Sequence, residues 1–233
     1  DETIFNTCAK IEFGDRASAP AAIPASLWEE QAVDPALLQP LPVAGHKGML
    51  QPSHLVTEND QSTDEPVPAD ISKAMKQRGI AIHRMLEQLT NGKTRPEVEK
   101  VLRQEFSEAV QETEFLACWK EVCAVVDHAA LREFYDPACY ETAHNEIPIL
   151  YRDGGQDAYG IVDRLVIGKD HMILIDYKTH RRATPGNIQT LAEEFAGQMR
   201  QYAAGASRLW PNKKLRVVLL FTACREIVEV PSP

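Results

Sequence analysis

Apolar residues recur at helical spacing in the segment that begins near Asp70. This stripe is made up of Ile82, Met85, Leu86 and Leu89. Such a spacing is typical of a helix with one buried side, and Asn91-Gly92 is expected to end it. Residues 96–110 and 114–131 repeat the helical pattern. The chain is therefore predicted to enter its folded part through a group of helices.

The pattern changes after Asp136-Pro137. Short runs rich in β-branched and aromatic residues follow, as is typical of strands. They occupy residues 139–153, 158–168, 171–180 and 215–223, and a helical segment over 187–208 separates the last two. The alternating run at 226–231 predicts an edge strand. The order of the predicted elements is a group of helices, three strands, a helix and two strands. This order predicts an α/β or α+β fold with one mixed sheet flanked by helices.

Composition divides the chain into two parts. Residues 1–69 are rich in Pro and Ala and carry little periodicity. Because such a segment cannot bury a core of its own, it is expected to be an irregular arm or linker, with one domain over residues 70–233. No apolar run is long enough to cross a membrane, and no membrane partner is expected.

Charge and cysteine content exclude some classes of protein. The 233 residues hold 25 Lys and Arg against 34 Asp and Glu, a formal net charge of −9. This balance excludes a protein that coats nucleic acid by bulk charge, although one local phosphate site remains compatible with it. The five cysteines form no C-x-x-C pair, which predicts neither a disulfide framework nor a zinc or iron–sulfur site. A reduced, cytoplasmic setting is expected.

Two aspartates are expected to face each other in the hairpin that spans residues 161–178. A turn centred on Lys169-Asp170 pairs Asp163 with Asp176. Strand alternation then places Ile161 and Leu165 on the face of Asp163. Two ionised carboxylates about 4 Å apart repel by about 4 kcal/mol at an effective dielectric constant near 20. Either one of them takes up a proton or a divalent cation lies between them, unless a one-residue slip of the register separates the pair.

Lys178 projects onto the face of Asp176, together with Leu174. A lysine there can hold a water or a phosphate oxygen beside the cation. A metal that neutralises charge and a water aligned for in-line attack are what phosphodiester hydrolysis requires. By itself a D-x-K tripeptide more often marks an exposed strand end, so the interpretation depends on the paired aspartates.

Three further polar residues lie on the predicted helices. His83 is at the margin of the first apolar stripe, where a lone histidine is more often packed or solvated than a ligand. Gln198 and Tyr202 are four residues apart and share a helical face. They either contact a substrate phosphate and steer the site, or form the polar rim of an ordinary amphipathic helix.

The order of four motifs resembles the nuclease domain of the RecB and AddA helicase–nucleases, which are PD-(D/E)XK nucleases. The motifs are RGIAIHRMLE, GIVDRLV, LIDYKTH and QMRQY, and the resemblance covers about residues 77–230. It implies a restriction-endonuclease-like core, and it is closer to the AddA branch than to the AddB branch. No iron–sulfur cluster is expected, because only Cys224 follows the last motif.

The resemblance assigns roles to individual residues. The implied metal ligands are His83, Asp163, Asp176 and the backbone carbonyl of Tyr177. Lys178 would be the catalytic lysine beside Asp163 and Asp176, and Glu146 would support the site. Gln198 and Tyr202 match the Q-x-x-x-Y motif. Apart from the resemblance, four arginines either supply local phosphate contacts or are solvated surface charges: Arg164, Arg181, Arg182 and Arg200.

The function expected from this likeness is that of a DNA nuclease, of exonuclease type, that depends on Mg²⁺ or Mn²⁺. It would belong to a helicase–nuclease of double-strand break repair and recombination. The implied partners are a DNA single strand delivered by an attached helicase, the helicase region of the same full-length chain, and a second AddB-like subunit. Two alternatives stay open: a catalytically silent nuclease fold that serves as a DNA-binding or docking module, and a metal hydrolase for small molecules.

Overall fold

The computed structural model describes residues 69–153 and 156–231, all within one compact unit that spans residues 46–233. The arm expected over residues 1–69 lies outside the described residues except for its last residue. Its boundary with a domain over residues 70–233 stays a prediction. In the described part of the chain, no helix is both long and apolar enough to cross a membrane.

The helices begin where the apolar stripes predict them. Gly92 has a φ of 76°, a left-handed conformation that favours glycine, directly after the first helix. The second helix begins with a capping box, in which the carboxylate of Glu97 accepts hydrogen bonds from the backbone nitrogen and hydroxyl of Thr94. The helices before the sheet are α1 (Ala69–Leu89), α2 (Arg95–Glu105), α3 (Glu112–Val126) and α4 (Arg132–Tyr135), with 3₁₀ turns η4 (Ala129–Leu131) and η5 (Pro137–Cys139).

The sheet has five strands in the order β1-β2-β3-β4-β5. The strands are β1 (Thr142–Asp153), β2 (Gln156–Ile167), β3 (His171–Lys178), β4 (Lys214–Phe221) and β5 (Glu226–Glu229). β3 and β4 are parallel, and the helix α5 (Ile188–Leu209) supplies the long crossover that a parallel pair requires. The other neighbours are antiparallel. The mixed sheet with flanking helices is the fold class that the sequence predicts.

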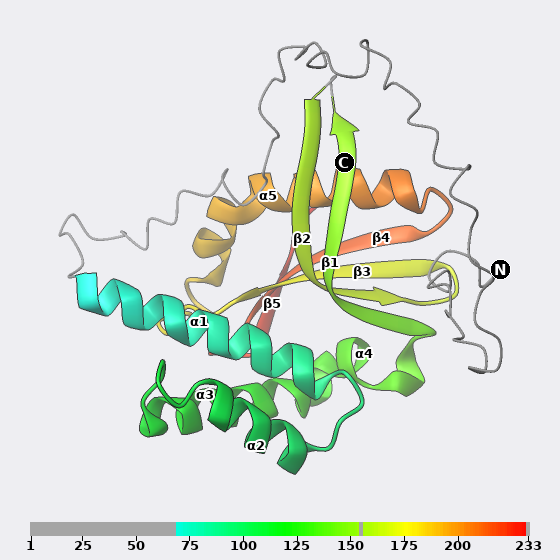
Figure 1. Ribbon diagram of the computed structural model, residues 1–233. Helices are drawn as coiled ribbons and strands as arrows, with labels where there is room; N and C mark the ends of the chain where they lie inside the picture. The colour runs from blue at the N-terminus through cyan, green and yellow to red at the C-terminus, as the bar shows by residue number, and fades with distance from the viewer. Residues whose placement is uncertain (1–68, 154–155, 232–233) are drawn as a thin grey trace, which may run out of the picture. The chain divides into compact units, whose positions relative to one another are not determined.

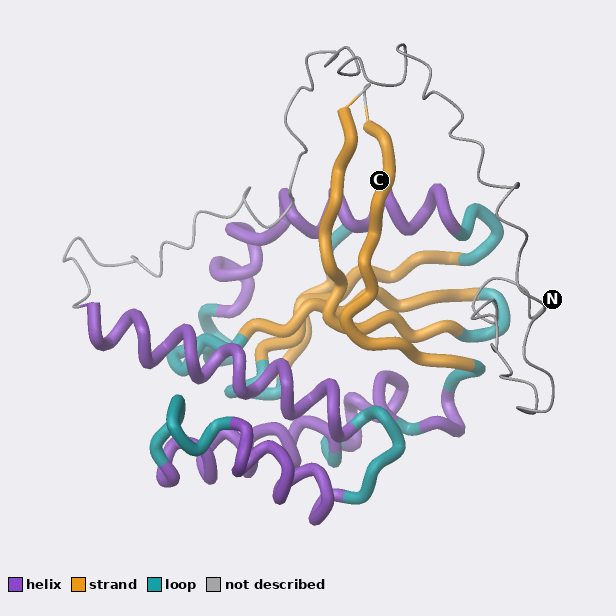
Figure 2. The backbone as a smooth tube through the Cα atoms, in the orientation of Figure 1, coloured by secondary structure: helices purple, strands orange, loops and turns teal. Residues whose placement is uncertain are grey.

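Helices cover both faces of the sheet. Figures 1 and 2 show α1, α2 and α3 on one side and α5 on the other. Each side has its own core. The first core joins α1–α4 to side chains such as Ile173 and Ile175, and the second joins α5 to their neighbours Met172 and Leu174. Every second side chain of β3 therefore enters the same core, as a pleated strand requires.

The hairpin of β2 and β3 has the predicted register. Arg164 pairs with Ile175 and Ile167 with Met172, so the next position along the ladder sets Asp163 against Asp176. β5 pairs antiparallel with β4 at the edge of the sheet, as the alternating pattern predicts.

The hairpin of β1 and β2 changes faces at one position. Ala143 packs against the α1–α4 core, whereas Ile149, also an odd-numbered residue of β1, lies in the α5 core. The pairing runs through Asn145 and resumes at Ile147, and Glu146 between them has a φ of 51°. A left-handed non-glycine residue is a local strain of the kind that gathers at functional sites.

The partner strand changes faces at the same place. Val166 belongs to the α1–α4 core and Val162 to the α5 core, although both numbers are even. The expectation that Ile161 and Leu165 share the face of Asp163 is therefore wrong. Leu165 is buried in the α5 core, whereas Ile161 is exposed. The strand turns over at Asp163, which strict alternation does not allow for.

Candidate functional site

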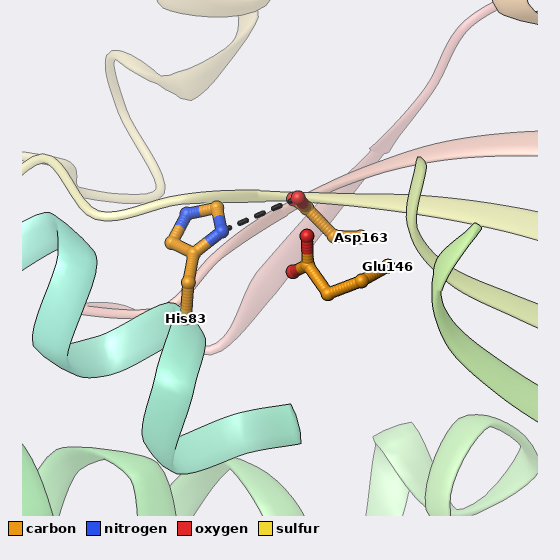
Figure 3. A group of neighbouring side chains, drawn as sticks. All are labelled: His83, Glu146 and Asp163. Carbon is orange, nitrogen blue, oxygen red and sulfur yellow. Dashed lines mark ion pairs between the residues drawn. The ribbon is translucent and has the colours of Figure 1, made fainter. Parts of the chain in front are cut away.

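Three side chains converge at the position where β1 and β2 change faces. His83 comes from α1, Glu146 from β1 and Asp163 from β2 (Figure 3). One donor atom from each lies within 4.8 Å of the other two. Glu146 is exposed, and the other two are half-buried. The three elements thus present one nitrogen and two carboxylate ligands to a common point.

Asp163 is fixed from two sides. Its Oδ2 accepts a hydrogen bond of 2.6 Å from the backbone nitrogen of Tyr177, and its Oδ1 lies 3.3 Å from Nδ1 of His83. The first contact continues the β2–β3 ladder beyond its last backbone pair. The carboxylate therefore stays at the edge of the ladder and points to α1.

Close packing of α1 on the end of β3 places His83. A side chain at Gly79 would bring a Cβ to 3.2 Å from Oγ1 of Thr179, so glycine permits this approach. The imidazole meets the Tyr177 ring edge-on, with centroids 5.7 Å apart. Arg78 adds a hydrogen bond of 2.6 Å to the carbonyl of Thr179.

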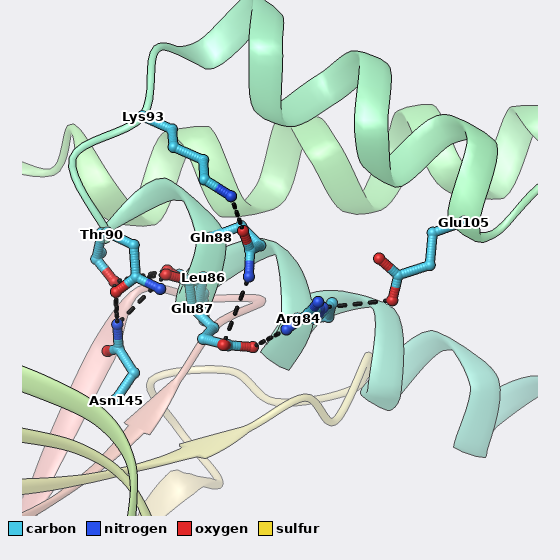
Figure 4. A network of polar contacts seen from close by, with 9 residues as sticks. Arg84, Leu86, Glu87, Gln88, Thr90, Lys93, Glu105 and Asn145 are labelled. Carbon is cyan, nitrogen blue, oxygen red and sulfur yellow. Dashed lines mark hydrogen bonds and ion pairs between the residues drawn. The ribbon is translucent and has the colours of Figure 1, made fainter. Parts of the chain in front are cut away.

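Asn145 ties the end of α1 to β1, immediately before Glu146. Its Nδ2 donates to Oγ1 of Thr90 at 2.9 Å and to the carbonyl of Glu87 at 3.3 Å (Figure 4). Its Oδ1 accepts from Arg164 at 2.8 Å. These bonds hold the start of the hairpin against α1, which brings the carboxylate of Glu146 toward His83.

The pKa values in the cluster reflect its crowded charges. Burial lowers the pKa of His83, but the charge and hydrogen bond of Asp163, with the charge of Asp176, outweigh burial and raise it to about 9. Burial raises the pKa of Asp163, yet His83 and the Tyr177 nitrogen reverse this, and the pKa is lowered overall. Burial and the charge of Asp163 raise the pKa of Glu146. The carboxylates therefore favour a positive neighbour, which the imidazolium provides.

Asp176 and Lys178 form a second, more deeply buried part of the site. The ammonium lies 2.8 Å from Oδ2 of Asp176, and both side chains are nearly inaccessible. Burial and then the charge of Asp163 raise the pKa of Asp176, although Lys178 opposes them. A carboxylate oxygen has two lone pairs, so this Oδ2 retains capacity for one further ligand beside the ammonium.

The arrangement differs in one respect from the expected pair of facing aspartates. The structure groups Asp163 with His83 and Glu146, and it places Asp176 against Lys178. The charges of the two aspartates still influence each other, as their pKa values indicate. Glu146, expected only to support the site, lies within the group of three donors.

The residues fit a hard divalent cation. The two carboxylates suit Mg²⁺ or Mn²⁺, whereas thiolates, which select softer metals, do not occur in the group. The carboxylates that raise the pKa of His83, together with the buried carboxylate of Asp176, indicate a site that needs positive charge. To bind the ion, the imidazole would have to be neutral. His83, Glu146 and Asp163 would hold such an ion, with Asp176 beside it.

Gln198 and Tyr202 stand behind Lys178. Oε1 of Gln198 accepts from the ammonium at 3.4 Å, and its Nε2 donates to the hydroxyl of Tyr202 at 3.2 Å. Tyr202 packs on Gly160, where a Cβ would come within 2.2 Å of the ring. Both α5 residues are buried, and Gln198 links Tyr202 to Lys178.

The arginines divide into two groups. Arg164 is 1% exposed and donates to the carbonyl of Phe134 at 2.9 Å. The expectation that Arg164 contacts phosphate is therefore wrong, because its guanidinium is enclosed. Arg181 pairs with Glu114, and it is exposed together with Arg182 and Arg200.

Some residues near the site were not singled out from the sequence. Phe195 places its ring centroid 3.6 Å from the ammonium of Lys178, and its spacing from Gln198 and Tyr202 could have indicated a shared helical face. Thr222 donates from its backbone nitrogen to the carbonyl of Lys178 at 3.0 Å and from its hydroxyl to Glu121 at 2.6 Å. Neither Phe195 nor Thr222 lies in one of the four sequence motifs.

The solved structures that align with the chain have low sequence identity to it. The chain aligns with a presumed exonuclease from Eubacterium rectale at 9% identity and a TM-score of 0.46, over 72% of this chain and 61% of that one. It aligns with the protein SSO0001 at 16% identity and a TM-score of 0.30, over 66% and 77% of the two chains. For protein VC1899 from Vibrio cholerae the values are 10% and 0.27, over 68% and 48%.

Sequence comparison gives the family. No curated protein matches the chain. The family model of the PD-(D/E)XK nuclease superfamily, however, matches residues 53–230, which include every site residue described above. The chain belongs to the PD-(D/E)XK nuclease superfamily.

Proposed function

We propose that this domain is a deoxyribonuclease that requires Mg²⁺ or Mn²⁺. The observation that carries the proposal is the convergence of His83, Glu146 and Asp163 beside the buried pair of Asp176 and Lys178. Few structural roles explain three acidic groups, an imidazole and an ammonium whose charges act on one another. Membership of a nuclease superfamily gives this chemistry its substrate class.

The site residues divide the work between them. His83, Glu146 and Asp163 would bind the cation, and Asp176 and the carbonyl of Tyr177 would complete its surroundings. The bound cation would stabilise the charge of the phosphate and make the attacking water more acidic. Asp163 and Asp176 are thus catalytic through the cation that they hold.

Lys178 acts on the phosphate or on the water. Its ammonium lies at the end of β3, between Asp176 and Gln198, where it would orient the water or stabilise the developing negative charge. Gln198 and Tyr202 would support that lysine. Arg181 and Arg182 follow Lys178 in the chain and are exposed, so they are the candidates for phosphate contacts.

The larger setting is also a proposal. We infer that the domain is part of a helicase–nuclease of double-strand break repair and recombination. An attached helicase would deliver a single strand to it for exonucleolytic cleavage, together with an AddB-like subunit. The motif order supports this setting, and the net charge of −9 is consistent with DNA delivered by another part of the protein. The four free cysteines of the described residues are consistent with a reducing cytoplasm.

Cleavage of linear single-stranded DNA tests the activity. The domain is incubated with 5′-labelled strands and Mg²⁺, Mn²⁺ or EDTA, next to the variant Asp163→Asn. Cleavage that EDTA and the substitution both abolish is expected. An inert wild type that shifts DNA in a gel would instead favour the silent binding module, because that alternative needs binding without hydrolysis.

A further inference from the structure

The ammonium of Lys178 has neighbours of three kinds. Asp176 provides a carboxylate oxygen at 2.8 Å, and Gln198 provides an amide oxygen at 3.4 Å. Phe195 provides an aromatic face, whose centroid is 3.6 Å from Nζ. Lys178 and Phe195 are only 9% and 7% exposed, so little water screens their contact.

These partners differ in what a divalent cation does to them. A cation near Asp176 draws on the same carboxylate charge that holds Lys178, and it repels the ammonium. The ring of Phe195 attracts the ammonium through its negative face, but it offers no oxygen to a hard cation. Metal binding at the carboxylates thus leaves two attractions on the ammonium: the ring of Phe195, and the amide oxygen of Gln198 at the longer distance of 3.4 Å.

The fold holds Phe195 in place. Residues 195, 198 and 202 are spaced three and four apart on α5, so they line one face of the helix toward β3. His180 packs on the Phe195 ring at 5.7 Å between centroids and on Phe221 at 6.4 Å. The ring therefore has neighbours of its own and does not depend on Lys178 for its position.

We propose that Phe195 is the positioning residue that keeps the Lys178 ammonium beside the carboxylate cluster when a divalent cation occupies the site. The inference rests on the proposed nuclease function, and it adds to that function a residue outside the four motifs. Phe195 is buried and carries no ligand atom for a metal, so its effect is exerted through Lys178. An acidic residue at position 195 would hold the lysine too, but it would also compete for the cation.

Two changes at position 195 test the inference. Phe195→Leu removes the ring, whereas trifluorophenylalanine at position 195 keeps its shape and removes most of its negative face. The matched control is Phe106→Leu, because Phe106 is 8% exposed at the end of α2 and packs in the other core. The turnover number, kcat, at saturating metal should fall about tenfold for both changes at 195, the equivalent of about 1.4 kcal/mol. KM and the dissociation constant for Mn²⁺ should stay within about twofold.

A measurement without metal or DNA separates the two proposals. In EDTA, unfolding is followed for wild type, for Lys178→Met, and for each of them with Phe195→Leu. The Phe195→Leu change should cost about fivefold to thirtyfold more in the unfolding equilibrium constant when Lys178 is present. Equal costs in both backgrounds, or a fluorinated ring with wild-type kcat, would overturn the inference. An inert wild type would refute the nuclease proposal, while the cycle in EDTA would still decide the contact.

Discussion

Two buried cations lie in the same sheet, and their surroundings differ. The guanidinium of Arg164 donates to the carbonyl of Phe134 at 2.9 Å, to Asn145 at 2.8 Å and to the hydroxyl of Tyr140 at 3.3 Å. All three acceptors are neutral, and the Tyr135 ring lies beside the guanidinium. Lys178 instead depends on one carboxylate, one long amide contact and one ring.

The difference separates a structural cation from a reactive one. Each acceptor of Arg164 belongs to a different segment, so the guanidinium joins α4, β1 and the loop before the sheet. The acceptors of Arg164 are neutral, so they do not attract a metal ion by charge. The carboxylate of Lys178 is shared with the metal cluster, so the ammonium lies where charges can rearrange. Burial by itself therefore does not distinguish the two roles, whereas the chemistry of the partners does.

Removing each cation gives the largest expected effects. Arg164→Met should lower the free energy of unfolding by about 2–4 kcal/mol, because buried acceptors lose their donor. Lys178→Met should lower kcat by about 100- to 1,000-fold and lower the free energy of unfolding by about 1–2 kcal/mol, because the ring contact is lost. Asp176 can then take up a proton, which limits the cost of losing its partner. Urea unfolding and single-turnover cleavage measure the two quantities. The contrast between the cations fails if Lys178→Met unfolds the domain as readily as Arg164→Met.

A change at Gly160 should disturb Lys178 and leave Arg164 unaffected. Gly160→Ala sets a Cβ against the Tyr202 ring, and overpacking of this kind costs about 1–3 kcal/mol. Because Tyr202 holds Gln198, which contacts Lys178, kcat should fall as well. Thermal melting and cleavage rates measure both effects. Gly197→Ala is the control, because a Cβ there has no neighbour within 4 Å; an equal loss in both variants would contradict the contact chain.

His83 is a third cation near these two, and its pKa lies in an accessible range. Its pKa of about 9 is above the value near 6.5 of an unfolded chain. In the metal-free protein, the contribution of protonated His83 to the free energy of unfolding is therefore fully present below pH 6.5. It is lost as the pH rises through 9. Because the ring is 31% exposed, about 1–2 kcal/mol is expected. Urea unfolding in EDTA at pH 6, 7.5 and 9 measures it, and His83→Gln with the same pH slope as wild type would contradict it.

The smallest effect is expected for a cation on the surface. Arg95 pairs with Asp127, and both side chains are largely open to solvent. Arg95→Ala should change the free energy of unfolding by less than about 0.5–1 kcal/mol, because solvent screens such a pair. Urea unfolding at low and high salt checks this. If Arg95→Ala lowered the free energy of unfolding as much as Arg164→Met, burial would not explain the large effect expected at Arg164.

Parts of the fold could be predicted because local rules decide them. The turn at Lys169-Asp170 sets the pairing of β2 with β3, and the alternation of the last segment marks an edge strand. The face change at Glu146 could not be predicted, because a glutamate rarely takes a positive φ and no neighbouring residue signals it. Simple alternation therefore misplaced Ile161 relative to Leu165.

The site shows the same limit. Strand spacing and motif order are enough to predict Asp163, Asp176 and Lys178 as site residues. The side chains that contact them come from distant segments and could not be predicted in the same way. Arg164 follows Asp163 directly and looked equally available to phosphate. Its burial is decided by Phe134 and Tyr140, which lie outside the hairpin. His83 joins the cluster only because α1 packs closely on the end of β3, an approach that no short segment encodes.

The sequence separation within the site has a consequence for folding. Glu146, Asp163, Asp176, Lys178 and the α5 residues lie in one stretch of the chain, whereas His83 is separated from Asp163 by α2, α3, α4 and β1. Contacts of long sequence separation carry the larger loop-closure cost and tend to form late. The imidazole of His83 would then be the last ligand to reach the site during folding. The affinity of the refolding chain for a cation would therefore measure whether α1 has docked on the sheet.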